Sequence, residues 1–170
     1  MMRTSSLFRD TNAAAAAEMA LVLPILLILI FGSVELGNYF MSEHAVEKAV
    51  RDASRYAARL PISNFDCTTG TMEDPTPVQE LARTGKPDGT DDDARLRDWT
   101  DKDMTTVTVA CDTDTSHTYV NGGIYTDFPM GVPVVTVSAT VPYTTLFGIL
   151  GLGAGTIDLN ASQQAAVTGA

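Results

Sequence analysis

The sequence predicts an α+β protein, in which a long N-terminal transmembrane helix continues into a small antiparallel β-sheet domain. Two patterns indicate this class. Residues 13–34 form an apolar run whose single charged side chain is Glu18. Three later segments alternate apolar and polar residues, as strands do. A chain of 170 residues is long enough for one modest domain and such a helix.

The apolar run would span about 33 Å as a helix, enough to cross the hydrocarbon core of a bilayer. Its apolar side chains lie all round the helix, which a small soluble domain could hardly bury. Pro24 lacks a backbone donor and is expected to bend the helix. Arg3 and Arg9 precede the run and the acidic part of the chain follows it. The N-terminus is therefore expected in the cytoplasm and the C-terminal part outside the membrane.

The helix is expected to continue to about Arg59. Apolar residues recur there at three- and four-residue spacing, and Pro61 forces Leu60 out of helical geometry. This stripe consists of Val46, Ala49, Val50, Ala53, Tyr56 and Ala57. A cleaved secretory signal peptide is the alternative interpretation of the apolar run. The run is longer than the usual core of about 7 to 15 residues, and no A-x-A cleavage site follows it.

Beyond Pro61 the composition changes. Residues 62–103 are rich in Pro, Gly, Thr and Asp. Pro77 and Gly85 are typical of the first and the terminating residue of a helix, so a short helix is expected between them. A weaker pattern indicates a second short helix at about Asp92–Thr100.

Three strands are expected at residues 106–111, 134–141 and 156–162. In each, apolar residues occupy one face and Thr, Ser, Asp or Asn the other, which is typical of an antiparallel sheet with one covered face. The apolar stripe of the long helix is the expected cover. The inward residues are Val107, Val109 and Cys111; Val135, Val137, Ala139 and Val141; and Ile157, Leu159 and Ala161. Between the last two strands, the apolar segment Leu146–Leu152 could fill the core or form an exposed contact patch.

Cys67 and Cys111 are the only cysteines, and both lie in the part of the chain expected outside the membrane. Thiols outside the cytoplasm tend to be oxidised, so we expect one disulfide between them. Two cysteines without nearby histidines do not complete a zinc site, and no metal or other cofactor is expected.

The charge distribution excludes nucleic-acid binding. The first 59 residues carry six Lys or Arg and six Asp or Glu, whereas the remainder carries five and fifteen. Such an acidic portion repels phosphate backbones. The acid-rich segment 85–103 lacks the ligand spacing of an EF-hand. Neither His44 nor His117 lies in a nucleophile motif, so no catalytic residue is assigned and no enzymatic activity is expected.

The N-terminal segment resembles the TadE-like minor pilins, or pseudopilins, of the tight-adherence (Flp) branch of type IV pili. The resemblance covers about 50 residues, Asn12–Leu60. It rests on the alanine-rich lead, the Glu, the Leu-Pro pair, the Gly-x-x-Glu-Leu-Gly exit and the Arg-x-x-x-Arg-Tyr-Ala helix end. These features fall on Ala14–Ala17, Glu18, Leu23 with Pro24, Gly32 with Glu35–Gly37, and Arg51 with Arg55–Ala57.

The resemblance implies cleavage by a prepilin peptidase on the cytoplasmic face. Pilins of this kind are usually cut after a Gly, which leaves Glu as the fifth residue, commonly followed by an aromatic. Placing Glu18 fifth puts the cut between Ala13 and Ala14 and makes Met1–Ala13 the leader. The chain departs from the pattern at two positions, because Ala13 replaces the Gly and Met19 replaces the aromatic.

Glu18 has a physical use in such an assembly. A carboxylate in hydrocarbon loses its hydration, so an acid at this position is a functional candidate. When apolar helices pack together, Glu18 could neutralise the new amino terminus of a neighbouring subunit and so fix the register, with Pro24 shaping the packing surface. The alternative is that Glu18 only marks the start of the helix, where the helix dipole tolerates an anion. Glu35 lies near the opposite interface, where a solvated carboxylate is expected.

The chain is therefore expected to be a non-enzymatic minor pilin with three parts: a cytoplasmic leader (1–13), the transmembrane helix and its extension (14–60), and an exported domain (61–170). The resemblance implies a location in the bacterial inner membrane or in the pilus. It implies the lipid bilayer, a prepilin peptidase, other major and minor pilins and the inner-membrane assembly platform as partners. The alternative is a single-pass envelope binding module that never enters a filament; an anchored enzyme is a more distant one.

Overall fold

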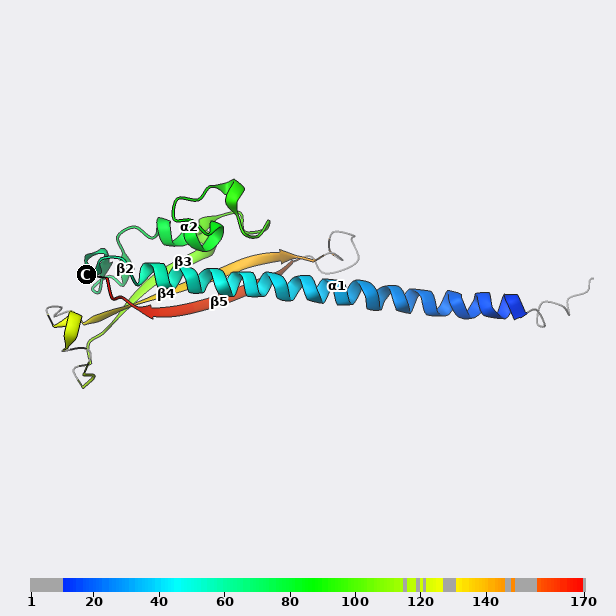
Figure 1. Cartoon of the computed structure of the whole chain (residues 1–170), viewed down its shortest axis with the longest axis horizontal. Coiled ribbons are helices and arrows are strands. Elements are labelled where there is room, and N and C mark those ends of the chain that lie inside the picture. Colours follow the sequence, from blue (N-terminus) through cyan, green and yellow to red (C-terminus); the bar gives the residue numbers. More distant parts are fainter. Residues whose placement is uncertain are drawn as a thin grey trace, which may run out of the picture. The chain divides into compact units, whose positions relative to one another are not determined.

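The computed structural model describes residues 11–114, 116–118, 120, 122–126, 131–145, 148 and 156–169 (Figure 1). The chain divides into two compact units, Met1–Tyr39 and Phe40–Ala170. Helix α1 (Thr11–Ala57) contributes residues to both units, and each unit is considered by itself. The three-part division expected from the sequence separates segments by their expected roles, whereas these units are separated by compactness. The three-part division stays a prediction.

Helix α1 confirms the expected long helix, whose ends fall within two residues of the predicted ones. The helix continues through Pro24. After Ala57 the backbone tightens into a turn, in which the N–H of Arg59 donates to the carbonyl of Tyr56 at 3.0 Å. Pro61 then precedes a short 3-10 turn at Ile62–Asn64. The restriction that Pro61 imposes on Leu60 thus coincides with the end of the helix.

The main sheet contains β3 (Thr105–Asp112), β4 (Val132–Thr144) and β5 (Thr156–Ala166), in the order β3-β4-β5 (Figure 1). Both pairings are antiparallel. The register places Val109 opposite Val135 and Val137 opposite Gln163. All three predicted strands are confirmed, and each extends beyond its predicted bounds.

The core of the second unit lies between one face of this sheet and the apolar stripe of α1. The stripe residues Val46, Ala49, Val50 and Ala53 are at most 1% exposed, and Val135, Val137 and Val141 on the sheet are fully buried. Ile157 is an exception among the predicted inward residues, because it is 48% exposed. Ile157 pairs with Tyr143 near the end of the β4–β5 ladder, in the two-stranded part of the sheet that β3, which begins opposite Ala139, does not reach.

Helix α2 (Thr76–Thr84) confirms the first expected short helix. Gly85 follows it with φ of 88°, the left-handed conformation that glycine adopts without strain. The side-chain amide of Gln79 donates to the carbonyl of Thr105 at 2.8 Å and so ties α2 to the start of β3.

The prediction of a second short helix at about Asp92–Thr100 is wrong. A single 3-10 turn at Asp91–Asp93 stands at its start, capped by Thr90 and Asp93. Ala94 then turns extended, with ψ of 130°. The N–H of Arg95 donates to the carbonyl of Arg83 at 2.9 Å. This contact with α2 takes the donor that a helix would have used.

A small hairpin, β1 (Phe65–Asp66) and β2 (Thr71–Met72), lies beside β3 and was not predicted. The carbonyl of Gly70 in its turn accepts a hydrogen bond from the N–H of Val109 at 3.0 Å. Cys67, in the same turn, is disulfide-bonded to Cys111 in β3, with 5.5 Å between the Cα atoms. The predicted disulfide is confirmed.

The last residues of the chain close the domain at the end of α1. The N–H of Thr168 donates to the carbonyl of Ala58 at 2.8 Å, and the N–H of Ile62 donates to the carbonyl of Gly169 at 3.2 Å. The hydroxyl of Tyr125 also donates to the carbonyl of Val167. Hydrogen bonds from residues far apart in the sequence therefore fix the backbone at the C-terminal end of α1.

Two segments singled out from the sequence lie outside the described residues. The leader is described only from Thr11 onward. Of the apolar segment Leu146–Leu152, only Gly148 is described, so both interpretations of that segment stand as they were.

Candidate packing helix and groove

The first candidate site is the apolar part of α1 in the first unit. Large apolar side chains are exposed on all sides of it, with Leu21 at 74%, Ile28 at 67% and Leu29 at 66% exposure. By length and composition this helix could cross a membrane, and none of its most apolar stretch is buried. It is a candidate membrane anchor whose apolar surface is available to lipid or to other helices.

Glu18 and Pro24 both lie on this part of α1. They are six positions apart in the sequence, so at about 100° per residue they lie roughly 120° apart around the helix axis. They do not form one site. Glu18 is exposed, so its carboxylate can reach a neighbouring molecule or solvent. Pro24 leaves the carbonyl of Ala20 without its usual donor in the helix.

Gly32 and Gly37 have open surroundings. A Cβ atom added at either position would meet no described heavy atom within 4 Å. Packing among the described residues therefore does not require glycine there, although glycine lowers helix stability by about 1 kcal/mol relative to alanine. Nearby, the Ser33 hydroxyl donates back to the carbonyl of Ile30 at 2.9 Å. Glu35 is half-buried.

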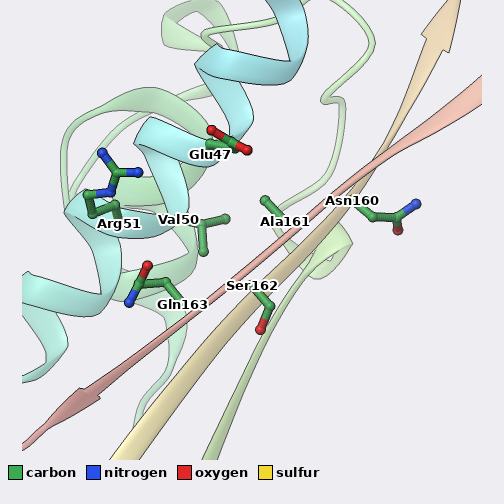
Figure 2. A pocket seen from close by; sticks show the side chains of 7 residues that line it. All are labelled: Glu47, Val50, Arg51, Asn160, Ala161, Ser162 and Gln163. Carbon is green, nitrogen blue, oxygen red and sulfur yellow. The ribbon is translucent and has the colours of Figure 1, made fainter.

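A second candidate site lies wholly in the second unit, along the seam between α1 and β5 (Figure 2). One hollow of about 240 Å³ is lined by Glu47, Val50, Arg51, Asn160, Ala161, Ser162 and Gln163. A second, of about 350 Å³, is lined by Arg51, Ser54, Arg55, Gln163, Gln164 and Ala165. Because Arg51 and Gln163 line both hollows, they form one groove, which we call the α1–β5 groove.

Sequence reasoning did not find this groove. In the sequence, Arg51 and Arg55 belong to a helix-end motif, and β5 is predicted only as a strand. Nothing in the local sequence indicates that these two segments, more than 100 residues apart, lie side by side. The four-residue spacing of the two arginines could have indicated that they share one helix face.

Residues 13–55 match the family model described as TadE-like protein. The chain carries a TadE-like helix. Neither the curated proteins nor the solved structures gave a match to the chain.

The TadE-like match includes Glu18, Pro24, Gly32, Glu35, Gly37 and Arg51, and it ends at Arg55. The β-sheet, the disulfide and α2 all lie beyond it. The family thus accounts for the candidate membrane anchor and for the helix side of the α1–β5 groove. The strand side of the groove belongs to the part of the chain that no comparison covers.

The acidic segment that follows α2 is partly neutralised by cations close to it in the fold. Arg83 is 2% exposed, and its guanidinium donates to Glu80 Oε2 at 2.8 and 3.0 Å. The third nitrogen of the guanidinium, Nη1, lies 2.9 Å from Asp91 Oδ1. Burial alone would lower the pKa of Arg83, but the hydrogen bonds and charges of Glu80 and Asp91 raise it. Lys86 pairs with Asp93 at 2.7 Å, and this contact lowers the pKa of that carboxyl.

Proposed function

We propose that this protein is a non-enzymatic minor pilin or pseudopilin that takes part in assembling a tight-adherence (Flp) type IV pilus. The observation that carries the proposal is a TadE-like helix that is apolar on every side and bears one exposed carboxylate, Glu18, near its start. Such a surface is suited to packing against similar helices in lipid.

In this proposal the helix is inserted in the bacterial inner membrane, with the N-terminus in the cytoplasm and the disulfide-bonded domain outside. A prepilin peptidase cuts between Ala13 and Ala14, which makes Glu18 the fifth residue. The new amino terminus of one subunit then pairs with Glu18 of a neighbour. A buried charge that lacks its partner is strongly unfavourable, so this pairing selects one register between subunits.

The glycines of the anchor fit the same proposal. Gly32 and Gly37 serve no packing need among the described residues of this chain. Small residues let helix backbones approach closely within a membrane. We therefore assign them to contacts with other pilins or with the inner-membrane assembly platform.

The experiment that tests the proposal replaces Glu18 in cells that assemble the pilus. Glu18→Ala should leave the amount of membrane-inserted protein unchanged and reduce the number of pili counted by electron microscopy. Glu18→Asp, which keeps the charge, should retain more pili than Glu18→Ala. Glu35→Ala is the control, because that acid lies near the other end of the apolar run. Unchanged pilus counts in Glu18→Ala would refute the assigned role.

A second candidate function is a single-pass envelope binding module that never enters a filament. The α1–β5 groove favours it, because the groove offers a hollow lined by polar and charged side chains outside the apolar part of the helix. The two functions differ in where the protein is found. The pilin must occur in sheared pili, whereas the binding module must stay with the membrane.

A further inference from the structure

The free edge of β5 is the starting point. β5 is the last strand in the order β3-β4-β5 and has no second neighbour among the described strands. The N–H of Val167 donates to the carbonyl of Pro133 at 2.9 Å, which makes these two residues a hydrogen-bonded pair. Such pairs alternate with non-bonded pairs along an antiparallel ladder. The even-numbered residues of β5 therefore direct their N–H and C=O groups away from β4.

Two further observations agree with this alternation. Pro142, which has no N–H, pairs with Asp158 at a non-bonded position. No hydrogen bond between β4 and β5 needs a donor there, so the proline does not weaken the ladder. On the other side of β4, Val109 of β3 pairs with Val135, and the same alternation directs the N–H of Val109 away from β4. That N–H does donate elsewhere, to Gly70. The outward groups of β5 thus include those of Asp158, Asn160, Ser162 and Gln164 in the middle of the strand.

This edge is only partly satisfied by its own side chains. The amide of Asn160 donates to the carbonyl of Asp158 at 3.2 Å, and the amide of Gln163 donates to the carbonyl of Gln164 at 3.1 Å. Both contacts are on the surface and both use carbonyls, so the outward N–H groups are left for solvent or for an added strand. An exposed row of such groups is a template for pairing with another chain.

Helix α1 forms the second wall beside this edge. Going along α1 from Glu47 to Arg55, the facing residues of β5 advance from Asn160 to Ala165. Helix and strand therefore run alongside each other in the same direction, and Figure 2 shows Val50 and Gln163 on the two sides of the groove. A groove between an edge strand and a helix is the geometry in which domains bind peptides by β-strand addition.

The charges in the groove favour an acidic occupant. Arg51 and Arg55 are exposed, and neither forms an ion pair in the part of the chain that the structure describes. Glu47, the one acid among the lining residues, lies 3.6 Å from His44. One helical turn separates the two arginines by about 6 Å, and alternate side chains of a strand repeat at about 6.8 Å. Carboxylates at positions i and i+2 of an added strand match this spacing.

We propose that the α1–β5 groove binds an extended acidic segment of another polypeptide, which adds to the edge of β5 as a fourth strand and places alternate carboxylates on Arg51 and Arg55. The backbone of β5 supplies affinity for any extended chain, and the two arginines select acidic ones. This proposal does not rest on the pilin function, because peptide binding and pilus assembly are measured separately.

The test measures binding of a defined probe to the full chain in detergent micelles. The probe is the fluorescein-labelled peptide Thr-Asp-Val-Asp-Val-Thr, and its binding is measured by fluorescence anisotropy. The matched control is the same peptide with Asn in place of both Asp residues. We expect the Asp peptide to bind at least tenfold more tightly than the Asn peptide and to weaken as salt is raised. No binding of the Asp peptide up to millimolar concentration would overturn the proposal.

Matched variants locate the binding. Replacing both arginines, Arg51→Gln with Arg55→Gln, should weaken the Asp peptide about tenfold, because two partly solvated ion pairs are lost. Arg59→Gln, an exposed arginine of the same segment outside the groove, should change the affinity less than twofold. Equal effects of the two changes would place the acidic peptide elsewhere.

Two readouts test the strand addition itself. Methylating the backbone nitrogens of the two Val residues, or of the two Asp residues, blocks opposite edges of the peptide, so only one of these peptides should lose binding. In hydrogen exchange, the N–H groups of Asn160, Ser162 and Gln164 should exchange quickly in the free protein and be protected by the Asp peptide. Equal effects of the two methylated peptides, or unprotected β5 amides with bound peptide, would overturn the edge-pairing.

Discussion

Cys67, in the turn between β1 and β2, is joined by a disulfide to Cys111 in β3, 44 positions later in the chain. The bond lies beside the hydrogen bond from Val109 to Gly70, so the small hairpin is held to β3 by both a covalent and a backbone contact. It fastens a segment with little secondary structure of its own to the main sheet.

Removing this disulfide should destabilise the domain. With Cys67→Ala and Cys111→Ala together, we expect the free energy of unfolding to fall by about 3 to 4 kcal/mol, because the unfolded chain regains the entropy of an open loop. Urea denaturation followed by the fluorescence of Trp99, the single and fully buried tryptophan, measures it. Reduction should lower the stability of the wild type by a similar amount and leave the variant unaffected. Free thiols at both positions in the protein purified without reductant would contradict the bond.

The buried Arg83 should matter more than a surface arginine. Arg83→Met removes both hydrogen bonds to Glu80 and the contact with Asp91. Since charge-assisted hydrogen bonds are lost from a nearly buried group, we expect a loss of about 2 to 3 kcal/mol of stability. Arg97→Met is the matched control, because that side chain is 78% exposed and its contact with Asp98 measures 3.6 Å. Equal losses of stability in the two variants would contradict the view that the buried contacts of Arg83 stabilise the domain more than those of a surface arginine.

Acid should weaken the β1–β2 turn through Asp66. The backbone N–H of Thr68 donates to Asp66 Oδ1 at 2.7 Å, and this bond holds the pKa of Asp66 below its ordinary value of 3.8. A depressed pKa contributes stability that is present above pH 3.8 and is lost as the pH falls through the lower, folded value.

Asp66→Asn keeps an acceptor for the turn but cannot titrate. Between pH 5 and pH 3, the free energy of unfolding should therefore fall less steeply in Asp66→Asn than in the wild type. Urea denaturation at each pH gives both slopes. Parallel slopes would mean that Asp66 does not carry this pH dependence.

Gly169 should tolerate no side chain. A Cβ atom there would collide with the carbonyl oxygens of Leu60 and Arg59. Gly169→Ala should therefore break the contacts of Thr168 and Ile62 at the end of α1 and speed the hydrogen exchange of these two amides. Gly37→Ala is the control, because its added Cβ meets no described atom within 4 Å. Unchanged protection in Gly169→Ala would contradict the close approach.

The sequence was sufficient for the elements whose side chains follow a regular period. Val135, Val137 and Val141 alternate with polar residues, and β4 is found where that pattern lies. Pro77 and Gly85 mark α2 for reasons confined to the residues themselves. The disulfide followed from the number of cysteines and the expected compartment rather than from any geometry.

What the sequence did not reveal depends on contacts between distant segments. The N–H of Arg95 donates to the carbonyl of Arg83 instead of continuing a helix, and the guanidinium of Arg95 lies 3.7 Å from Asp52 of α1. The β1–β2 pairs are too short to show a period. The α1–β5 groove exists only because the chain returns to α1 after more than 100 residues, which no local pattern encodes.

N-terminal sequencing of the protein, extracted from membranes and from sheared pili, tests the central claim most directly. In cells with an active prepilin peptidase, the protein from both fractions should begin at Ala14, and deleting the peptidase should restore the leader and remove the protein from pili. A terminus that still includes residues 1–13 in both strains, with no protein in the sheared fraction, would contradict the assignment as a pilin.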